Sequence, residues 1–217
     1  MKIILTGGTG FVGGQVLKEL IRDDRVTSVV AISRRPLKMS HAKLEVVIHK
    51  DFEKWDDDAL LEKLKGSEAC IWCVGGGAWE FPDYETAYKV QVTYTVNAAK
   101  AFAERLGPMR FVFCSGRWAA RDERGKLRFF GDTRRIKGAA ENGLLEIAKK
   151  HQGFFPYCMR IGGVMPASLF GTLITATVAW TAPVVKVDQA AKAMVHVALN
   201  GAKKDTLENE EIHSNKL

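Results

Sequence analysis

Three glycines near the beginning of the chain have the spacing of a loop that binds a nucleotide diphosphate. The run Thr6-Gly7-Gly8-Thr9-Gly10-Phe11-Val12-Gly13 directly follows a short apolar stretch and opens a helical pattern. Glycine allows a tight turn and lets backbone amides approach a pyrophosphate, whose negative charge then lies at the positive end of the helix. We therefore expect a dinucleotide to contact Gly7, Thr9, Gly10, Phe11, Val12 and Gly13.

Two alternatives to a dinucleotide loop start from the same residues. A glycine-rich turn can join a strand to a helix without any ligand, because glycine adopts positive φ angles easily. A P-loop would need Gly-Lys-Ser or Gly-Lys-Thr after the glycines to reach terminal phosphates and magnesium. The sequence has neither at this place. The position of the glycines between a strand and a helix favours the dinucleotide.

The residues about twenty positions after the glycines indicate which dinucleotide binds. An Asp or Glu there would accept hydrogen bonds from the adenosine ribose, but the chain has Ser33-Arg34-Arg35. A guanidinium group is a planar fork of donors that suits a phosphate. Arg34 and Arg35 therefore predict a 2′-phosphate and hence NADP(H) rather than NAD(H). The alternative is that both arginines are simply solvated at the surface.

An alternation of strands and helices must position these residues. Near-continuous apolar runs predict strands of a sheet covered on both faces, and they span 2–6, 28–32, 44–48, 69–74, 110–114 and 157–160. Helical spacings lie at 11–22, 58–64, 83–106, 132–151 and 188–200. This alternation predicts an α/β fold with a doubly wound parallel sheet, a Rossmann fold, with right-handed crossovers.

The length of the chain predicts one domain over residues 1–217, in which residues 164–217 add a small cap on the substrate side. The apolar segment 168–185 contains Gly171 and Pro183 and barely reaches spanning length, so we expect it to be buried rather than to cross a membrane. The polar residues beyond 201 are expected to close the fold or to fray, with a brief final strand at 210–213 as the alternative.

Composition excludes several classes of protein. Lysine and arginine total 32 against 25 acids, a net charge of +7, but they are spread along the chain without a nucleic-acid recognition motif. Four cysteines lie in or beside apolar runs, which predicts core packing, no disulfide scaffold and a reducing, cytoplasmic location. Cys70 and Cys73 lack the further ligands of a metal site. We expect a small-molecule substrate, no nucleic acid and no membrane as partners, and leave a homodimer open.

Further motifs stand at the ends of the expected strands. They are Cys73-Val74-Gly75-Gly76, Phe113-Cys114-Ser115-Gly116 and Arg160-Ile161-Gly162-Gly163, with Lys137-Gly138-Ala139-Ala140-Glu141 in a helix. With the glycine loop and the arginines, they make the sequence resemble the short-chain dehydrogenase/reductase superfamily, specifically its atypical NAD(P)-binding, NmrA-like and TIP30-like branch. The resemblance implies cofactor contacts for Asp51 and Phe52 at the adenine, Val74 and Gly75 along a ribose, and Ile161 and Gly162. From the residues alone, Asp51 could equally cap the segment that follows it.

The same resemblance implies the catalytic residues. In that superfamily a tyrosine exchanges the substrate proton, a lysine four residues later lowers its pKa and holds the nicotinamide ribose, and a serine orients the substrate. Ser115 and Lys137 match, but the tyrosine position is Thr133. A threonine hydroxyl does not ionise near neutral pH, whereas a phenol with a pKa of about 10 can be shifted toward it. Either another group supplies the proton, or the hydride acceptor needs no strong acid, or there is no redox chemistry.

Other residues bear on the proton and the substrate. The side chains that could supply the proton instead are Tyr84, Tyr88, Asp122 and Asp132, although such residues more often pack or face solvent. The segment 117–130 mixes aromatic and charged residues at the carboxyl end of the expected sheet, where ligands of open α/β folds bind. We therefore expect this segment to contact the substrate.

These observations lead to one hypothesis and two alternatives. The hypothesis is an NADP(H)-dependent oxidoreductase of the atypical short-chain type that acts on a small apolar or aromatic carbonyl or quinone. The first alternative is a redox-silent NADP(H)-binding protein with a regulatory or partner-binding role. The second is a lyase, isomerase or cyclase that retains the fold without net redox chemistry. Turnover of NADPH separates the first two, and activity without added nucleotide identifies the third.

Overall fold

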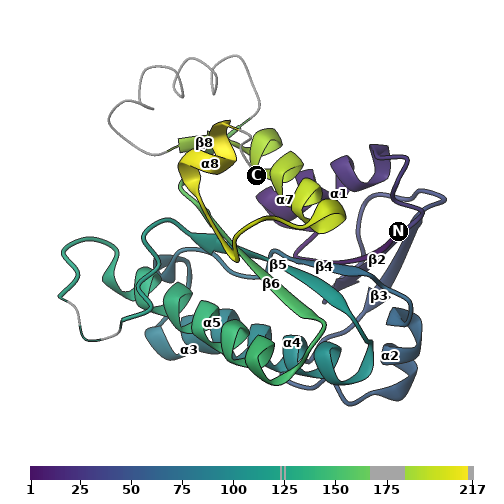
Figure 1. Ribbon diagram of the computed structural model, residues 1–217, viewed down its shortest axis with the longest axis horizontal. Helices are drawn as coiled ribbons and strands as arrows, with labels where there is room; N and C mark the ends of the chain where they lie inside the picture. The colour runs from purple at the N-terminus through teal and green to yellow at the C-terminus, as the bar shows by residue number, and fades with distance from the viewer. Residues whose placement is uncertain (123, 125, 167–183, 215–217) are drawn as a thin grey trace.

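The computed structural model describes residues 1–122, 124, 126–166 and 184–214. Its centre is a seven-stranded sheet in the order β3-β2-β1-β4-β5-β6-β9, and every neighbouring pair is parallel (Figure 1). The strands are β1 Lys2–Thr6, β2 Ser28–Ser33, β3 Leu44–Ile48, β4 Ala69–Trp72, β5 Met109–Gly116, β6 Phe154–Ile161 and β9 Thr206–Glu208. The strand order reverses between β1 and β4, so the carboxyl ends of these strands border the crevice where ligands of such folds bind.

Helices cover both faces of the sheet. On one face lie α2 Asp58–Leu64, α3 Tyr84–Tyr88, α4 Tyr94–Arg105 and α5 Gly131–Lys150, and on the other lie α1 Phe11–Arg22, α7 Val187–Asn200 and α8 Asn209–Ser214 (Figure 1). The predicted doubly wound Rossmann architecture is confirmed. Each strand contributes alternate side chains to two separate hydrophobic cores, as Ile3 and Leu5 do beneath α1 while Ile4 faces α2 to α5.

The helix expected over 83–106 is divided into three parts. After α3 the chain makes one π-helical turn, η2 Lys89–Thr93, before α4 begins. A π-helical turn inserts an extra residue into the helical repeat, and such turns occur frequently at functional sites. Here the turn contains Gln91, whose side chain is completely buried beneath the carboxyl end of β4.

The described C-terminal residues join the main body of the fold. Helix α7 packs beside α1, and β9 extends the central sheet next to β6. A second, two-stranded sheet pairs β7 Gly163–Met165 with β8 Val184–Lys186. The strand expected at 210–213 is wrong, because these residues belong to helix α8, in which Ile212 is buried and two acidic residues favourably occupy the first turn.

Residues 167–183, which make up most of the expected buried apolar segment and a large part of the expected cap, lie outside the described residues. The extent of the cap therefore stays a prediction. Within the part of the chain that the structure describes, no helix combines the length and the apolar character needed to cross a membrane.

Candidate active site

The glycine loop has the tight geometry that a dinucleotide site needs. Gly7 has a φ of 71°, and a Cβ added there would lie 2.4 Å from the carbonyl oxygen of Cys73. A Cβ on Gly13 would lie 2.2 Å from the carbonyl oxygen of Gly7. Gly10 is the N-cap of α1 and offers no side-chain acceptor to the first-turn amides. The exposed start of α1 therefore presents backbone donors and a positive helix end to an anion.

Arg34 and Arg35 border this loop. Both are exposed directly after β2, and the backbone N–H of Arg35 donates to the Ser33 hydroxyl oxygen at 3.3 Å. A Cβ added to Gly8 would lie 3.6 Å from the side chain of Leu37, so the segment that carries the arginines runs beside the glycine loop. No acidic residue occurs from position 34 to position 44. The two arginines thus stand on an exposed segment beside the glycine loop that has no carboxylate of its own.

The carboxyl end of β4 forms the other wall of the crevice. The backbone N–H of Cys73 donates to the Thr6 hydroxyl at 3.3 Å, which ties the ends of β4 and β1 together. Gly75 has a φ of 134°, and a Cβ there would lie 2.8 Å from Gln91 Oε1 and 3.1 Å from Lys137 Nζ. Only glycine therefore fits between Gln91 and Lys137. The glycines at positions 7, 13 and 75 thus let the glycine loop, the end of β4 and the side chains of Gln91 and Lys137 pack closely together.

Lys137 reaches this crevice from α5. Its side chain is buried, and Nζ donates to the carbonyl oxygen of Cys114 at 3.1 Å and lies 5.2 Å from the Phe113 ring centre. Burial lowers the pKa of Lys137, while the thiols of Cys114 and Cys73 oppose that shift. The lysine is held at the edge of the crevice next to Gly75, where the resemblance expects the nicotinamide ribose.

The Thr133 side chain takes part in a hydrogen bond between two segments of the fold. Its hydroxyl oxygen accepts from the backbone N–H of Ala78 at 2.8 Å. Ala78 begins the short 3-10 helix η1 Ala78–Glu80, which follows β4. The residue at the tyrosine position therefore ties α5 to the loop after β4, and this contact gives it no acid strength.

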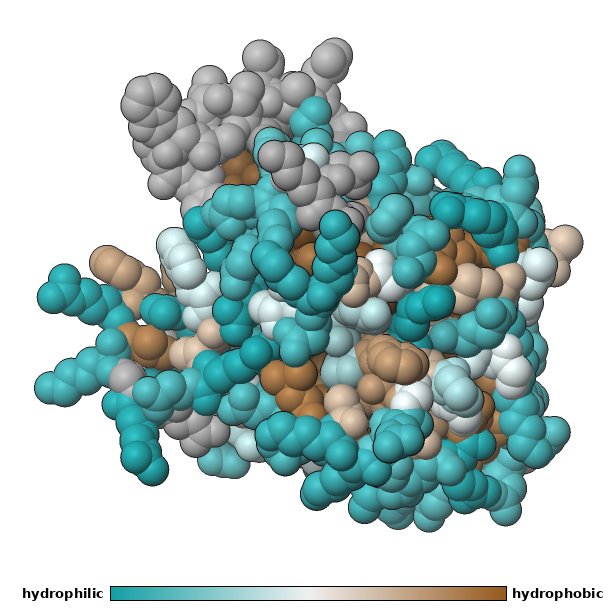
Figure 2. Space-filling model, viewed as in Figure 1, coloured by the Kyte–Doolittle hydropathy of each residue, from teal (hydrophilic) through white to brown (hydrophobic). Residues whose placement is uncertain are grey.

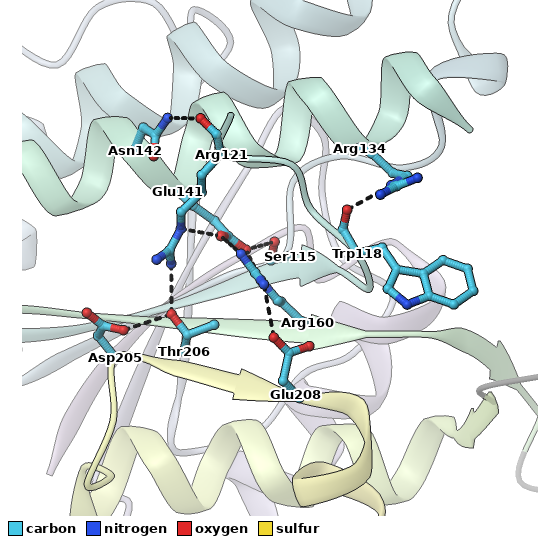
Figure 3. A network of polar contacts seen from close by, with 10 residues as sticks. All are labelled: Ser115, Trp118, Arg121, Arg134, Glu141, Asn142, Arg160, Asp205, Thr206 and Glu208. Carbon is cyan, nitrogen blue, oxygen red and sulfur yellow. Dashed lines mark hydrogen bonds and ion pairs between the residues drawn. The ribbon is translucent and has the colours of Figure 1, made fainter. Parts of the chain in front are cut away.

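The Ser115 hydroxyl is hydrogen-bonded to a buried carboxylate. It donates to Glu141 Oε1 at 2.6 Å, and both side chains are buried. Glu141 also accepts from Arg121 Nε at 2.7 Å and from Arg160 Nη2 at 2.7 Å (Figure 3). Because its proton is committed to Glu141, Ser115 can only accept a hydrogen bond from a substrate. The orienting role expected for Ser115 stays a prediction.

The Glu141 network continues into the last strand. Arg160 donates to Glu208 at 2.9 Å, and Arg121 donates to the Thr206 hydroxyl at 2.7 Å (Figure 3). The hydrogen bond to Glu141 raises the pKa of Arg160, so this guanidinium stays charged. Since Glu141 lies one helical turn after Lys137, the network fixes the part of α5 that carries the lysine. The sequence motif at 137–141 indicated the helix but not these partners.

The remaining expected cofactor contacts, at Asp51, Phe52, Val74, Ile161 and Gly162, stay predictions. Asp51 is exposed, and its carboxylate accepts from the Glu53 backbone N–H at 3.1 Å, as a local turn cap does. The Phe52 ring is buried in an aromatic core cluster, so this side chain does not face the crevice. Ile161 is buried, and the Gly162 N–H donates to Asn209 Oδ1 at 2.8 Å. Val74 is half-buried and packs against the core beneath α5.

Exposed aromatic side chains gather near the lysine side of the crevice. Trp79 and Phe130 have ring centres 5.4 Å apart and are both largely exposed. Trp118 is half-exposed, and its carbonyl oxygen accepts from Arg134 Nε at 2.8 Å (Figure 3). Trp118 and Phe130 both adopt a left-handed backbone, with φ of 61° and 52°. Such strained conformations concentrate at ligand sites.

The loop between β5 and α5 carries exposed hydrophobic side chains within a largely hydrophilic surface. Figure 2 shows hydrophobic side chains among hydrophilic ones at the left end of the molecule, where the loop between β5 and α5 projects in Figure 1. This loop contains the segment expected to contact the substrate. Trp118, Phe129 and Phe130 in this loop are exposed.

The alternative proton donors make contacts within their own segments, and the Asp132 carboxylate lies 3.9 Å from the Arg135 guanidinium on the same helix. Tyr84 and Tyr88 pack against each other, with ring centres 6.1 Å apart. Asp122 accepts from the Arg124 backbone N–H at 3.0 Å, which is a local turn. The sequence reasoning missed Glu80, whose carboxylate accepts from the Gly77 N–H at 2.6 Å and contributes to the field at Lys137. Its position in the loop after β4 gave no recognisable motif.

Comparison with known proteins identifies the family. A model of the NAD dependent epimerase/dehydratase family matches residues 3–128, which include the glycine loop, both arginines and strands β1 to β5. The chain belongs to this family. Two fungal proteins are related in sequence. The chain is 36% identical over 117 residues to leucinostatins biosynthesis cluster protein T of Purpureocillium lilacinum, and 33% identical over 115 residues to the mitochondrial protein FMP52 of Meyerozyma guilliermondii.

The matches cover only part of the related proteins and of the solved structures. Each fungal alignment covers 53% of this chain but only 42% and 48% of the relatives, so the chain spans less than half of their length. The PhqB reductase domain of Penicillium fellutanum has a TM-score of 0.69 at 19% identity, over 95% of this chain and 66% of that chain. Gre2 of Candida albicans, solved with NADPH, has a TM-score of 0.71 at 16% identity, over 96% and 77%. MoeE5, solved with UDP-glucuronic acid and NAD, has a TM-score of 0.70 at 19% identity, over 95% and 74%.

These structures show a shared fold. They include complexes with NAD and with NADPH, so the fold alone does not distinguish the two cofactors. The predicted cytoplasmic location also stays a prediction, since one related protein is mitochondrial by name.

Proposed function

We propose that this chain is an NADP(H)-dependent oxidoreductase that acts on a small apolar or aromatic carbonyl or quinone, as an atypical member of the family close to the NmrA-like and TIP30-like branch. The observation that carries the proposal is the pair Arg34 and Arg35, exposed beside the glycine loop in a segment without acidic residues. A 2′-phosphate satisfies both guanidinium groups, whereas a bare ribose hydroxyl leaves them without an anion.

The residues around the crevice fit the rest of the cofactor. The first-turn amides of α1 bind the pyrophosphate, and Lys137 holds the nicotinamide ribose next to Gly75. The bound cofactor supplies a hydride. Lys137 is buried, and its ammonium donates a hydrogen bond to the Cys114 carbonyl oxygen. This ammonium stabilises negative charge that develops on a nearby substrate oxygen.

The substrate class follows from the missing phenol and the aromatic surface. Thr133 does not act as an acid, so the reaction suits an acceptor whose reduced form carries negative charge easily, as a quinone does. Trp79, Trp118 and Phe130 provide flat apolar surface for such a ring. The proton then comes from water or from a side chain other than Thr133.

The direct test of the reaction is oxidation of NADPH by the purified chain. The acceptors are a panel of quinones and aromatic aldehydes, with aliphatic sugars as the matched comparison. We expect turnover with quinones, weaker turnover with aldehydes and none with sugars. Replacing Lys137 with Met, which retains the length of the side chain without its charge, should lower kcat at least tenfold. Undiminished turnover by the Lys137→Met variant contradicts the role given to the lysine.

A second candidate function is favoured by the hydrogen bond of Thr133. Because this residue tethers the loop after β4, the site is also suited to a redox-silent NADP(H)-binding protein with a regulatory or partner-binding role. Tight NADPH binding without turnover on any acceptor of the panel supports that function. The family also contains epimerases and dehydratases by name, so conversion of a substrate without consumption of added nucleotide supports the lyase, isomerase or cyclase alternative.

A further inference from the structure

Cys73 and Cys114 face each other across two neighbouring strands. Trp72 of β4 pairs in register with Phe113 of β5, so the next residues of both strands lie opposite each other. Trp72 and Phe113 belong to the core beneath α5, whereas the two cysteines pack against the core beneath α1 and α7. Both thiols therefore point to the same face of the sheet, at the same register of two adjacent strands.

The spacing suits a covalent bond between the two sulfur atoms. Neighbouring strands lie about 4.8 Å apart. A disulfide needs a Cα separation of roughly 4.4–6.8 Å. Side chains that leave the same face of adjacent strands at the same register meet this Cα requirement, and a small local approach of the two strand ends brings the Cβ atoms to the roughly 3.5–4.5 Å that the bond needs. The end of β4 is also held in place, because the Cys73 N–H donates to Thr6.

The pair differs from the other two cysteines in access and in environment. Cys73 and Cys114 are only half-buried, whereas Cys70 and Cys158 are buried. The neighbouring Cys73 thiol, helped by the charge of Lys137 and opposed by burial, lowers the pKa of Cys114 to about 7. The Cys114 thiol and burial raise the pKa of Cys73. One thiol is thus prepared to react as a thiolate, and a second thiol stands next to it, as in cysteine pairs that respond to oxidants.

We propose that Cys73 and Cys114 form a reversible disulfide when the chain meets hydrogen peroxide. The Cys114 thiolate attacks one peroxide oxygen, the O–O bond breaks, and hydroxide leaves and takes up a proton to become water. The Cys114 sulfenic acid is then attacked by the Cys73 sulfur, which gives up its proton as the S–S bond forms and a second water leaves. Two thiols lose two electrons and two protons, and one peroxide becomes two waters.

The disulfide lies directly against the glycine loop. Added Cβ atoms on Gly7 and Gly13 would lie 3.1 and 3.2 Å from the Cys73 Cβ, so no further side chain separates Cys73 from the loop. A dinucleotide bound there covers the crevice through which peroxide reaches Cys114. Bound NADPH should therefore slow formation of the disulfide, and this part of the inference rests on the proposed function.

The test uses the full reduced chain, hydrogen peroxide and peptide mapping without reductant. Trypsin cuts after Lys65, Lys89, Arg110 and Arg117, so the disulfide joins peptide 66–89 to peptide 111–117. We expect this cross-linked pair after peroxide treatment, and its loss after dithiothreitol. Its absence in wild-type protein, with Cys114 oxidised to sulfinic acid instead, overturns the proposal.

Variants assign the sulfur atoms, because peptide 66–89 also contains Cys70. Cys70→Ala should retain the cross-link, and Cys73→Ser should abolish it. In Cys73→Ser the sulfenic acid on Cys114 has no thiol to resolve it, so a dimedone adduct should accumulate at Cys114. A cross-link that survives Cys73→Ser, or no dimedone adduct in the folded variant, contradicts the assignment.

A parallel reaction with saturating NADPH separates the two claims. A cross-link that forms without nucleotide but at an unchanged rate with NADPH supports the disulfide and contradicts only the placement of the cofactor. No cross-link in either reaction contradicts the disulfide and leaves the cofactor to its own binding test.

Discussion

The hydroxyl oxygen of Thr133 lies 2.8 Å from the backbone nitrogen of Ala78, and this bond joins the first turn of α5 to the loop that follows β4. A tyrosine at this position would project a phenol over the crevice instead. The contact gives the departure from the expected catalytic residue a physical role, because it fixes the loop that carries Trp79 and Glu80 beside Lys137.

The first prediction concerns this tether. Thr133→Val retains the shape of the side chain but leaves the Ala78 N–H without its acceptor, so the free energy of unfolding should fall by roughly 1–2 kcal/mol. Urea denaturation followed by circular dichroism measures the change. The matched control is Thr27→Val, at an exposed threonine away from the site, which should change stability by less than about 0.5 kcal/mol. Equal effects of the two substitutions would show that the tether contributes little.

The second prediction concerns the buried carboxylate. Glu141→Gln removes the negative charge that Arg121 and Arg160 share, so we expect a loss of about 3–5 kcal/mol in unfolding free energy. Glu146→Gln on the same helix breaks an exposed ion pair with Lys149 and should cost less than about 1 kcal/mol. Urea denaturation of both variants measures the difference. A Glu141→Gln variant as stable as Glu146→Gln would contradict the role of the network.

The third prediction compares two adjacent glycines of α1. Gly13→Ala places a Cβ 2.2 Å from the Gly7 carbonyl oxygen, which must displace the glycine loop. Gly14→Ala places a Cβ 3.4 Å from the Gly8 carbonyl oxygen and gains the helix propensity of alanine, worth about 0.5–1 kcal/mol. Gly13→Ala should therefore lower both stability and nucleotide affinity, whereas Gly14→Ala should retain both. Calorimetry measures the nucleotide affinity and thermal melting measures the stability of the two variants. Equal affinity and stability of the two variants would contradict the prediction.

The fourth prediction is the pH dependence of alkylation at Cys114. Its pKa is lowered to about 7, so its thiolate is scarce at pH 6 and dominant at pH 8. The rate of reaction with iodoacetamide should rise through pH 7 and level off above about pH 8, whereas an ordinary thiol with a pKa of about 8.5 continues to gain. Cys73→Ser, which replaces the thiol donor with a hydroxyl, tests whether the neighbour sets the midpoint. A midpoint above about pH 8.5 in the wild-type chain would contradict the lowered pKa.

The sequence predicted the parts of the fold that depend on local patterns. The alternation of apolar strands and amphipathic helices was sufficient for the parallel sheet, and the bounds of α1 and α2 agree with the spacing of their apolar residues. The π-helical turn at Gln91 was not predictable, because apolar spacing continues through it. The helix at 209–214 was missed because a six-residue segment carries too little periodicity to tell a helix from a strand.

The candidate site divides in the same way. The glycine loop and the Arg34-Arg35 pair are each a short continuous motif that follows a strand. Because the two strands, β1 and β2, are neighbours in the sheet, the two motifs lie side by side. The partners of Ser115 and the opposition of Cys73 and Cys114 depend on the register between distant segments, which no local pattern encodes. The resemblance places Phe52 near the adenine, and the burial of its ring among the aromatic side chains of the core depends on tertiary packing that no local pattern encodes.

The affinity for NADPH relative to NADH tests the central claim most directly, measured by calorimetry on the wild-type chain and on Arg34→Ala/Arg35→Ala. The control, Arg22→Ala/Arg25→Ala, removes the same charge near the other end of α1. We predict that the wild-type chain and the control prefer NADPH, and that the Arg34/Arg35 double variant loses at least tenfold in NADPH affinity with little change for NADH, since a hydrogen bond to a charged group contributes about 1.5–3 kcal/mol. Equal losses for the two nucleotides, or no binding of either by the wild-type chain, would contradict the account.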